Sequence, residues 1–440
     1  MTPRTVCLAL ALPALAGAQD ALIIQHVTVI DGTGGSPVHN ASVVVNDGRI
    51  AAIGPGDSVA LPDGADRIDA RGKTLVPGII NLHGHVGLTM GLVQAQENYT
   101  HENVLDNLRT YASYGVTTTT SLGTDMNLVV PIRDAIRAGR LPGLTRVLTA
   151  LQGFTTRDGY PTTAPGVKGL AIEVSSAAAA RAHVKRLADA GADLVKMWID
   201  AHHGAFEKLP QNVFRAIIEE AAGRGLVTTA HLYDLEDAKL LADAGLDLMA
   251  HSVRDSEVDD DLASKMRANN VTYAPTLTRE LSTYVYADSP NWLNDRFFTK
   301  GVSADLVRDL RTTMRDVQRA DPEQQINRQN LRMALTNLKK LSDAGVKIGF
   351  GTDTGPPGRF AGYFEHLEAE LMVEAGLTPM QVIVAFSKNA SEAVGIDESF
   401  GTLAEGKNAD MLLLAGNPLD DIRNLRKIEA VFIGGQRVSM

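Results

Sequence analysis

The chain has 440 residues, of which 44% are hydrophobic and 21% charged, and its formal net charge is −10. This length and composition fit a globular protein with one large domain and one smaller domain. The acidic balance, together with the lack of any run rich in lysine and arginine, excludes nucleic acids and anionic membrane surfaces as partners.

The first 18 residues have the pattern of a secretory signal peptide. Arg4 precedes a short apolar run, and Ala16-Gly17-Ala18 fits a small-residue cleavage site. The apolar run is too short to span a bilayer, so we expect no membrane insertion after its removal. We predict an exported, periplasmic protein cleaved after Ala18; the alternative is a short frayed N-terminus. The only cysteine, Cys7, lies in this segment, so the metal ligands of the mature chain must be nitrogen or oxygen.

Short apolar runs with turn residues between them occur at both ends of the mature chain. Residues 19–76 contain several such runs joined by Asp-Gly turns, and residues 396–440 contain ADMLLLAG and EAVFIGGQRV. Alternating runs joined by Asp-Gly turns are typical of β-hairpins. We therefore predict that the two ends form one small β-sandwich domain around a long central insertion.

Residues 77–395 alternate between helical and extended patterns and carry an internal repeat. Helical segments end at Gly191, Gly245 and Gly345, and an apolar run follows each glycine directly. Glycine most easily takes the left-handed conformation beyond a helix C-terminus. Repeated helix–strand units predict a parallel sheet with right-handed crossovers. The fold predicted for this α/β domain is a distorted (β/α)8 TIM barrel, with strands at 79–85, 116–122, 145–151, 193–199, 226–231, 246–251, 271–278 and 347–353.

One stretch, residues 279–340, is too long for a tight connection between the seventh and eighth predicted strands. It is largely helical and charged in pattern. A long link on the catalytic side of a barrel is usually a lid or a specificity element. The alternative is a solvated helical hairpin that takes no part in binding.

Residues with metal-ligand chemistry stand at the ends of several predicted strands. His83 and His85 point the same way because strand side chains repeat every two residues. A polar ligand-type residue at the end of a buried strand costs free energy unless something there needs it. The carboxyl ends of the strands are where active sites form in such barrels. We therefore predict one binuclear metal site made of His83, His85, Lys196, His231, His251 and Asp353.

Lys196 is the unusual member of this set. A lysine on an apolar strand is strongly destabilising unless its charge is paired or lost. If CO2 carboxylates the amine, the resulting carbamate has two oxygens that bridge two metal ions. The alternative is a stem that packs on the strand while the amine reaches water. The four neighbouring histidines favour the carbamate.

The remaining ligands suggest how the site works. His231 and His251 end neighbouring strands and suit a second metal ion, and Asp353 suits both a metal ligand and a general base. Two cations lower the pKa of a bridging water so that hydroxide forms near neutral pH, and a carboxylate nearby takes its proton. The ligand types favour zinc, with manganese, cobalt and nickel as alternatives.

The six residues together resemble the binuclear, carboxylated-lysine type of the amidohydrolase superfamily. Within it, the chain is similar to the imidazolonepropionase-like and Xaa-Pro dipeptidase (prolidase) branch, which includes ochratoxin-hydrolysing amidohydrolases. The resemblance covers nearly the whole mature chain, including LVPGIINLHGH and the C-terminal GTLAEGKNADMLLLAGNPL.

This resemblance implies a division of the ligands between the two metals. His83, His85 and Asp353 would hold the first metal, His231 and His251 the second, and carboxylated Lys196 would bridge them. True imidazolonepropionases and deaminases use one metal and need no lysine on the fourth strand, so Lys196 argues against them. The family also implies a homo-oligomer.

Three further residues are candidates for contact with substrate. Tyr233 stands where related dipeptidases place a tyrosine that polarises the scissile carbonyl; the alternative is an ordinary loop tyrosine. Arg359 suits a substrate carboxylate, which a guanidinium binds with two parallel hydrogen bonds, although a surface arginine is the commoner outcome. His202 follows the fourth strand and could line the mouth of the site, or be simply exposed.

We therefore predict an exported hydrolase that cleaves an amide bond in a small substrate, such as an Xaa-Pro dipeptide or an N-acyl or N-aroyl amino acid. A lactonase or phosphotriesterase could use the same site, because metal-hydroxide chemistry needs only a polarised electrophile. A non-catalytic periplasmic binding protein is the alternative from another class, and the complete ligand set argues against it.

Overall fold

The computed structural model describes residues 21–439. The predicted signal peptide at 1–18, its cleavage site after Ala18 and Cys7 lie outside the described residues. Among the helices of residues 21–439, none is both long enough and apolar enough to cross a membrane.

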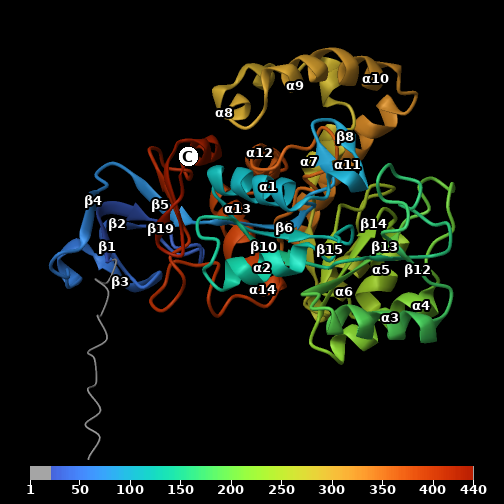
Figure 1. The fold of residues 1–440 in the computed structure, drawn as a ribbon, viewed down its shortest axis with the longest axis horizontal. Coiled ribbons are helices and arrows are strands. Elements are labelled where there is room, and N and C mark those ends of the chain that lie inside the picture. Colours follow the sequence, from blue (N-terminus) through green and yellow to red (C-terminus); the bar gives the residue numbers. More distant parts are fainter. Residues whose placement is uncertain (1–20, 440) are drawn as a thin grey trace, which may run out of the picture.

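Both ends of the chain contribute strands to one eight-stranded sheet, seen at one end of the molecule in Figure 1. Val43 and Leu75 from the N-terminal part pack with Met411 and Phe432 from the C-terminal part in a hydrophobic core of this sheet. The strand order is β19-β18-β17-β5-β1-β2-β3, with β4 beside β1. The strands are β1 (Leu22–Val29), β2 (Val38–Asn46), β3 (Arg49–Pro55), β4 (Asp66–Asp69), β5 (Thr74–Pro77), β17 (Met411–Leu414), β18 (Ile428–Ile433) and β19 (Gln436–Arg437).

Local sequence explains the hairpin between β2 and β3. Asp47 and Gly48 join the strands, and both have positive φ, 48° and 75°. A two-residue type I′ turn requires positive φ at both positions, which Asp-Gly tolerates best. The predicted Asp-Gly turn is present.

The central part of the chain is a distorted parallel barrel, so the predicted fold class is confirmed. Its strands form two parallel groups, one in the order β10-β9-β6 and one in the order β12-β11-β13-β14-β15-β16. They are β6 (Ile79–Gly84), β9 (Val116–Ser121), β10 (Arg146–Thr149), β11 (Phe154–Thr155), β12 (Ile172–Glu173), β13 (Leu194–Ile199), β14 (Val227–Leu232), β15 (Leu248–Ala250) and β16 (Thr272–Ala274).

Backbone hydrogen bonds close the barrel where regular strands are missing. The predicted eighth strand at 347–353 is irregular, yet it lies between β16 and β6: Tyr273 donates to the carbonyl of Lys347 at 2.9 Å, and Leu82 to that of Phe350 at 2.8 Å. The predicted seventh strand at 271–278 ends at Ala274, because Pro275 has no N–H to give to a ladder.

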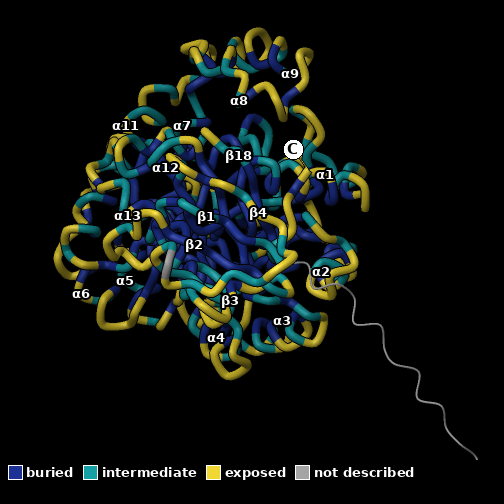
Figure 2. Tube along the Cα trace, turned by 90° about the vertical axis from the view of Figure 1, so that its left-hand side faces the viewer, coloured by how far each residue is buried: buried dark blue, intermediate teal, exposed yellow. Residues whose placement is uncertain are grey.

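Helices surround the barrel strands. Figure 2 views the molecule from the side of the eight-stranded sheet and shows buried chain at the centre with exposed turns around it. Each predicted helix end in the repeat is present: Gly191, Gly245 and Gly345 follow α3, α5 and α11 with φ of 88°, 84° and 77°. The helices are α1 (His101–Ser113), α2 (Val129–Arg137), α3 (Ala177–Asp189), α4 (Gln211–Ala222), α5 (Leu235–Asp243), α6 (Asp260–Ala268), α12 (Tyr363–Glu374), α13 (Pro379–Val384) and α14 (Ala390–Ala393). Smaller elements are β7 (Thr89–Met90), β8 (Val93–Gln94), η1 (Gly56–Ser58), η2 (Gln96–Asn98), η6 (Ala385–Asn389) and η7 (Ile422–Arg426).

The long link after β16 forms a helical arm above the barrel (Figure 1). Trp292 packs in an aromatic cluster that joins this arm to α12, with its ring centroid 4.9 Å from that of Phe298 in the arm and 5.3 Å from that of Tyr363 in α12. That this element is a mobile lid stays a prediction. Its parts are α7 (Leu277–Ser282), η3 (Val285–Asp288), η4 (Asn291–Asn294), α8 (Arg296–Thr299), α9 (Ala304–Asp309), η5 (Leu310–Met314), α10 (Arg315–Ala320) and α11 (Gln324–Asp343).

Candidate metal centre

The predicted ligands converge at the carboxyl ends of the barrel strands. The ring centroids of His83 and His85 lie 5.4 Å apart, those of His83 and His251 4.5 Å, and those of His231 and His251 4.3 Å. His83, His251 and Asp353 each offer one ligand atom, and these atoms lie within 4.8 Å of one another. The ends of β6, β14 and β15 and the irregular eighth segment thus bring ligand residues to one pocket of about 210 Å³, which we call the metal pocket. Lys196, inside β13, is not among the residues that line it.

The backbone at two of these positions is held in an unfavourable conformation. His251 has φ of 77° and Asp353 φ of 59°. A non-glycine residue in the left-handed region costs about 1–3 kcal/mol, and such residues cluster at functional sites. These positive φ angles are typical of functional residues, whose side-chain placement is kept although the backbone conformation lowers stability.

Each of three imidazoles has one ring nitrogen tied to the protein. His85 Nδ1 contacts Thr124 Oγ1 at 2.9 Å, His251 Nδ1 contacts Thr276 Oγ1 at 2.7 Å, and His231 Nε2 contacts the carboxylate of Asp200 at 2.7 Å. Metal-binding histidines are usually held in this way, which fixes the ring and leaves the other nitrogen for the metal.

Two buried polar atoms of the site have no partner within the described chain. Lys196 Nζ and His83 Nδ1 are buried without a hydrogen bond, and the Lys196 side chain is 0% exposed. An unpaired buried amine costs several kcal/mol, about 2–7 even for a neutral polar group. The four histidines and the carboxylate therefore form a donor set that fits divalent metal ions, with an unpaired amine beside it.

Burial sets the protonation states that metal binding needs. Burial lowers the pKa of the Lys196 amine to about 7, with Asp353 opposing that shift, so that neutral amine is abundant near pH 7. Burial also lowers the pKa of His231 to about 4, against the opposing effect of Asp200. For Asp353, burial would raise the pKa, but Arg359, His83 and His85 hold it well below its usual range. Neutral imidazoles and an ionised carboxylate are the forms that bind cations.

Arg359 lies in the metal pocket but is not free for a substrate carboxylate in this structure. Its Nη1 pairs with Asp353 Oδ2, and its Nε donates to Ser282 Oγ at 3.0 Å. Arg359, which we expected to bind a substrate carboxylate, is thus paired with the carboxylate of Asp353.

Tyr233 and His202 line a neighbouring cavity instead of the metal pocket. This outer cavity, of about 710 Å³, lies between the loop after β13, α7, and the α10–α11 part of the arm. Tyr233 donates its hydroxyl to Asn330 Oδ1 at 3.0 Å, and the guanidinium of Arg254 lies 4.8 Å from its ring centroid. The backbone N–H of His202 donates to Asp200 at 2.7 Å. Their proposed contact with substrate is therefore through the outer cavity.

Sequence analysis missed Asp200 and Tyr160. Asp200 directly follows β13. An acidic residue at the end of an apolar run was the pattern that indicated Asp353, and the same pattern could have indicated Asp200. Tyr160 lines the metal pocket with its ring 5.1 Å from that of His231. It lies in a loop without strand or helix periodicity, so no pattern in the sequence marks it.

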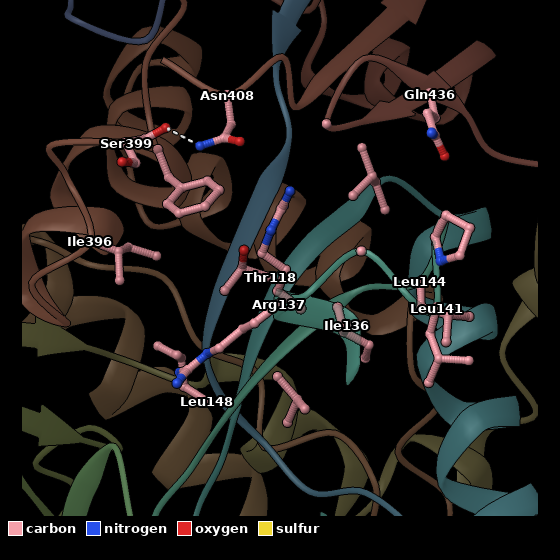
Figure 3. Close-up of a pocket in the computed structure, with 18 of the residues that line it drawn as sticks. Thr118, Ile136, Arg137, Leu141, Leu144, Leu148, Ile396, Ser399, Asn408 and Gln436 are labelled. Carbon is pink, nitrogen blue, oxygen red and sulfur yellow. Dashed lines mark hydrogen bonds between the residues drawn. The ribbon is translucent and has the colours of Figure 1, made fainter. Parts of the chain in front are cut away.

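A third cavity lies away from this chemistry, where β9, β10 and α2 meet the C-terminal segment (Figure 3). It has a volume of about 530 Å³ and mixed arginine and aliphatic walls. Arg137 pairs with Asp193 and Arg146 with Asp410. None of the predicted ligands lines it, so the metal pocket remains the site of interest.

The fold and the site together define a metal-dependent hydrolase of the barrel type. The chain belongs to the amidohydrolase family, whose model matches residues 74–438. It is 26% identical to the imidazolonepropionase of Streptomyces avermitilis over 395 residues, which are 87% of this chain and 83% of that protein. It is also 25% identical to the ochratoxinase of Aspergillus niger over 228 residues, 51% of this chain and 40% of that one.

Solved structures agree with this family. A Bifidobacterium longum protein described as a prolidase has a TM-score of 0.75 at 27% identity, covering 96% of this chain and 95% of that one. An Xaa-Pro dipeptidase with bound methionine in its active site has a TM-score of 0.76 at 22% identity, covering 96% and 100%; at that identity the likeness shows the fold alone. The predicted family and the predicted hydrolase class are confirmed.

Proposed function

We propose that this chain is a binuclear metal-dependent amidase for small substrates that carry a carboxylate, such as an Xaa-Pro dipeptide or an N-acyl or N-aroyl amino acid. One observation supports the binuclear centre above all: a fully buried lysine, with a pKa lowered to about 7, beside the buried His83, His231 and His251. A purely structural role for Lys196 would leave its amine unpaired in the core.

Lys196 has the protonation state that carboxylation needs. The neutral amine attacks CO2, a C–N bond forms, and one proton leaves, so the product is an anionic carbamate. With His83, His85 and Asp353 on one side and His231 and His251 on the other, the site then offers ligands for two divalent cations, of which zinc fits this N and O donor set best. When bound, two such cations would polarise the substrate carbonyl and lower the pKa of a water between them, so that hydroxide is available near neutral pH.

Asp353 is placed to move the proton of the reaction. Its Oδ1 lies 3.0 Å from His85 Nε2 and 3.3 Å from His83 Nε2, and Arg359 holds the other oxygen. Ionised and oriented in this way, Asp353 accepts a proton from the attacking water and passes it to the leaving nitrogen.

Asp200 is a positioning residue in this proposal. Burial would raise its pKa, but the hydrogen bonds from His231 and from the backbone N–H of His202 hold the pKa low, so the carboxylate stays ionised. An ionised carboxylate on Nε2 fixes the ring of His231 and makes its other nitrogen a better ligand. Trp198, 5% exposed, and Tyr160 form walls that limit water in the pocket.

Metal content and turnover test the proposal together. The chain without residues 1–18 is purified with zinc and bicarbonate, and metal is counted in wild type, Lys196→Ala and the exposed control Lys185→Ala. Activity is measured on Xaa-Pro dipeptides, N-acyl amino acids, a lactone and a phosphotriester. We expect two metals per chain and amide hydrolysis in wild type and control, and loss of both in Lys196→Ala. One metal with Lys196→Ala unchanged, or turnover of the ester substrates alone, would contradict the proposal.

A further inference from the structure

The outer cavity adjoins the metal pocket through a shared side chain. The carboxylate of Asp200 lines the outer cavity and also contacts His231 Nε2 at 2.7 Å, while His231 lines the metal pocket. A substrate with its amide at the metal ligands therefore has one end within reach of the outer cavity. The volume of about 710 Å³ is in the usual range for a ligand site.

The wall of this cavity holds two guanidinium groups against one buried glutamate. Glu280 has a 0% exposed side chain and pairs with Arg254 Nη1 at 3.2 Å and with Arg279 Nη1 at 3.0 Å. Arg254 also donates from Nη1 to the carbonyl of Ser252 at 3.1 Å and from Nη2 to that of Leu232 at 3.2 Å. Glu280 thus has one negative charge facing two guanidinium groups. The carboxylates of Asp200, Asp321 and Glu323 also line the cavity, so Arg279 lies in a wall of mixed charge.

The guanidinium of Arg279 also has N–H donors without a partner among the described residues. Its only side-chain hydrogen bonds among residues 21–439 run from Nη1 to the two oxygens of Glu280, which leaves Nε and Nη2 without a partner. The side chain is 14% exposed, and it lines the outer cavity. A mostly buried guanidinium with free N–H groups suits a carboxylate, which it binds through two parallel hydrogen bonds.

The position of Arg279 fits a ligand that spans both cavities. Burial would lower its pKa, but Glu280, Tyr160, Asp353 and Asp200 raise it. Two of these residues, Tyr160 and Asp353, line the metal pocket, so Arg279 lies within electrostatic reach of the site of cleavage. Arg359, the other arginine at the site, is already paired with Asp353.

We infer that Arg279 is the specificity residue that binds the free carboxylate of the substrate, and that the amino acid released by cleavage occupies the outer cavity. This inference rests on the proposed function, since it names which end of an amide substrate lies where. It predicts that amides without a nearby carboxylate are poor substrates even when their scissile bond is identical.

A matched pair of substrates tests the inference. The first compound of each pair is an N-benzoyl amino acid or a dipeptide with a free carboxylate. In the second compound a hydroxymethyl group replaces the carboxylate, which removes the charge and adds no second cleavable bond. We expect wild type to prefer the carboxylate by about 10- to 100-fold in kcat/KM, the usual range for a hydrogen bond to a charged group. In Arg279→Met this ratio is expected to fall below about three, mainly because KM for the carboxylate substrate rises, while the metal content stays as in wild type.

Two further variants sharpen the result. Arg332→Met, which removes an exposed arginine of α11 outside the cavity, is the control and is expected to keep the wild-type ratio. Arg279→Lys keeps the charge without the planar fork and is expected to give an intermediate ratio. If Arg279→Met does not fold, the inference is still tested by the kcat/KM ratios of wild type and of Arg279→Lys for the same substrate pair.

The outcomes separate this inference from the proposed function. Equal cleavage of both partners by wild type, or an unchanged ratio in Arg279→Met or Arg279→Lys, would overturn the inference and leave the amidase intact. A metal-loaded wild type that cleaves neither partner would overturn both.

Discussion

Replacing Lys196 by methionine is expected to stabilise the metal-free protein while it abolishes metal binding. Methionine fills a similar volume without a charge. In wild type the amine is fully buried without a hydrogen-bond partner, and burial lowers its pKa from 10.5 to about 7. Since one pKa unit corresponds to about 1.4 kcal/mol, the lysine destabilises the fold below pH 7 by about 5 kcal/mol.

The sign of the pH dependence follows from where the proton binds. The unfolded chain keeps the lysine proton up to about pH 10.5, whereas the folded chain releases it above about pH 7. Between these values the unfolded state binds more protons at Lys196, so the contribution of this lysine to stability rises with pH. The advantage of Lys196→Met is therefore about 5 kcal/mol at pH 6 and about 2 kcal/mol at pH 9.

Urea unfolding of the metal-free proteins in CO2-free buffer measures this advantage. Taking the difference between variant and wild type at each pH cancels the titration of other buried groups. Lys185→Met, an exposed lysine of α3 with a 58% exposed side chain, is the control and is expected to show no such change. An advantage that is equal at pH 6 and pH 9, or a variant less stable than wild type at pH 6, would refute the reasoning. Added zinc should reverse the order, because it stabilises only a fold that binds it.

Three further outcomes are expected. Asp353→Asn removes the proton acceptor and should lower kcat by about 10²- to 10⁴-fold in steady-state assays; a loss below threefold would exclude this role. Asp200→Asn should weaken metal affinity by about 10- to 100-fold through His231, measured by competition with a chelator, whereas the exposed Asp189→Asn should not. Burial raises the pKa of Glu365 from 4.5 to about 7, so this group alone should lower the stability of wild type, relative to Glu365→Gln, by about 3 kcal/mol as pH rises from 4.5 to 8. Glu365→Gln should lack that loss in urea unfolding; the same pH profile in both proteins would contradict the assignment.

Patterns confined to a few neighbouring residues were enough to predict the barrel and its candidate ligands. The pair His83 and His85 depends only on the two-residue repeat of a strand, and the glycines that end helices in the repeat depend only on local backbone conformation. Asp353 ends an apolar run at the edge where parallel strands must gather. These features are local, so they can be recognised without knowing which segments meet.

The tertiary structure decided what each ligand touches and where substrate can lie. The carboxylate of Asp353 pairs with Arg359, Tyr233 bonds Asn330 on α11, and Arg279 shares Glu280 with Arg254. The arm above the barrel brings Asn330 to the outer cavity from a position 97 residues after Tyr233. Such contacts depend on how distant segments pack, and no periodicity within either segment encodes them. The residue types that gather at the site were therefore predictable from sequence, whereas the separation of the metal pocket from the outer cavity was not.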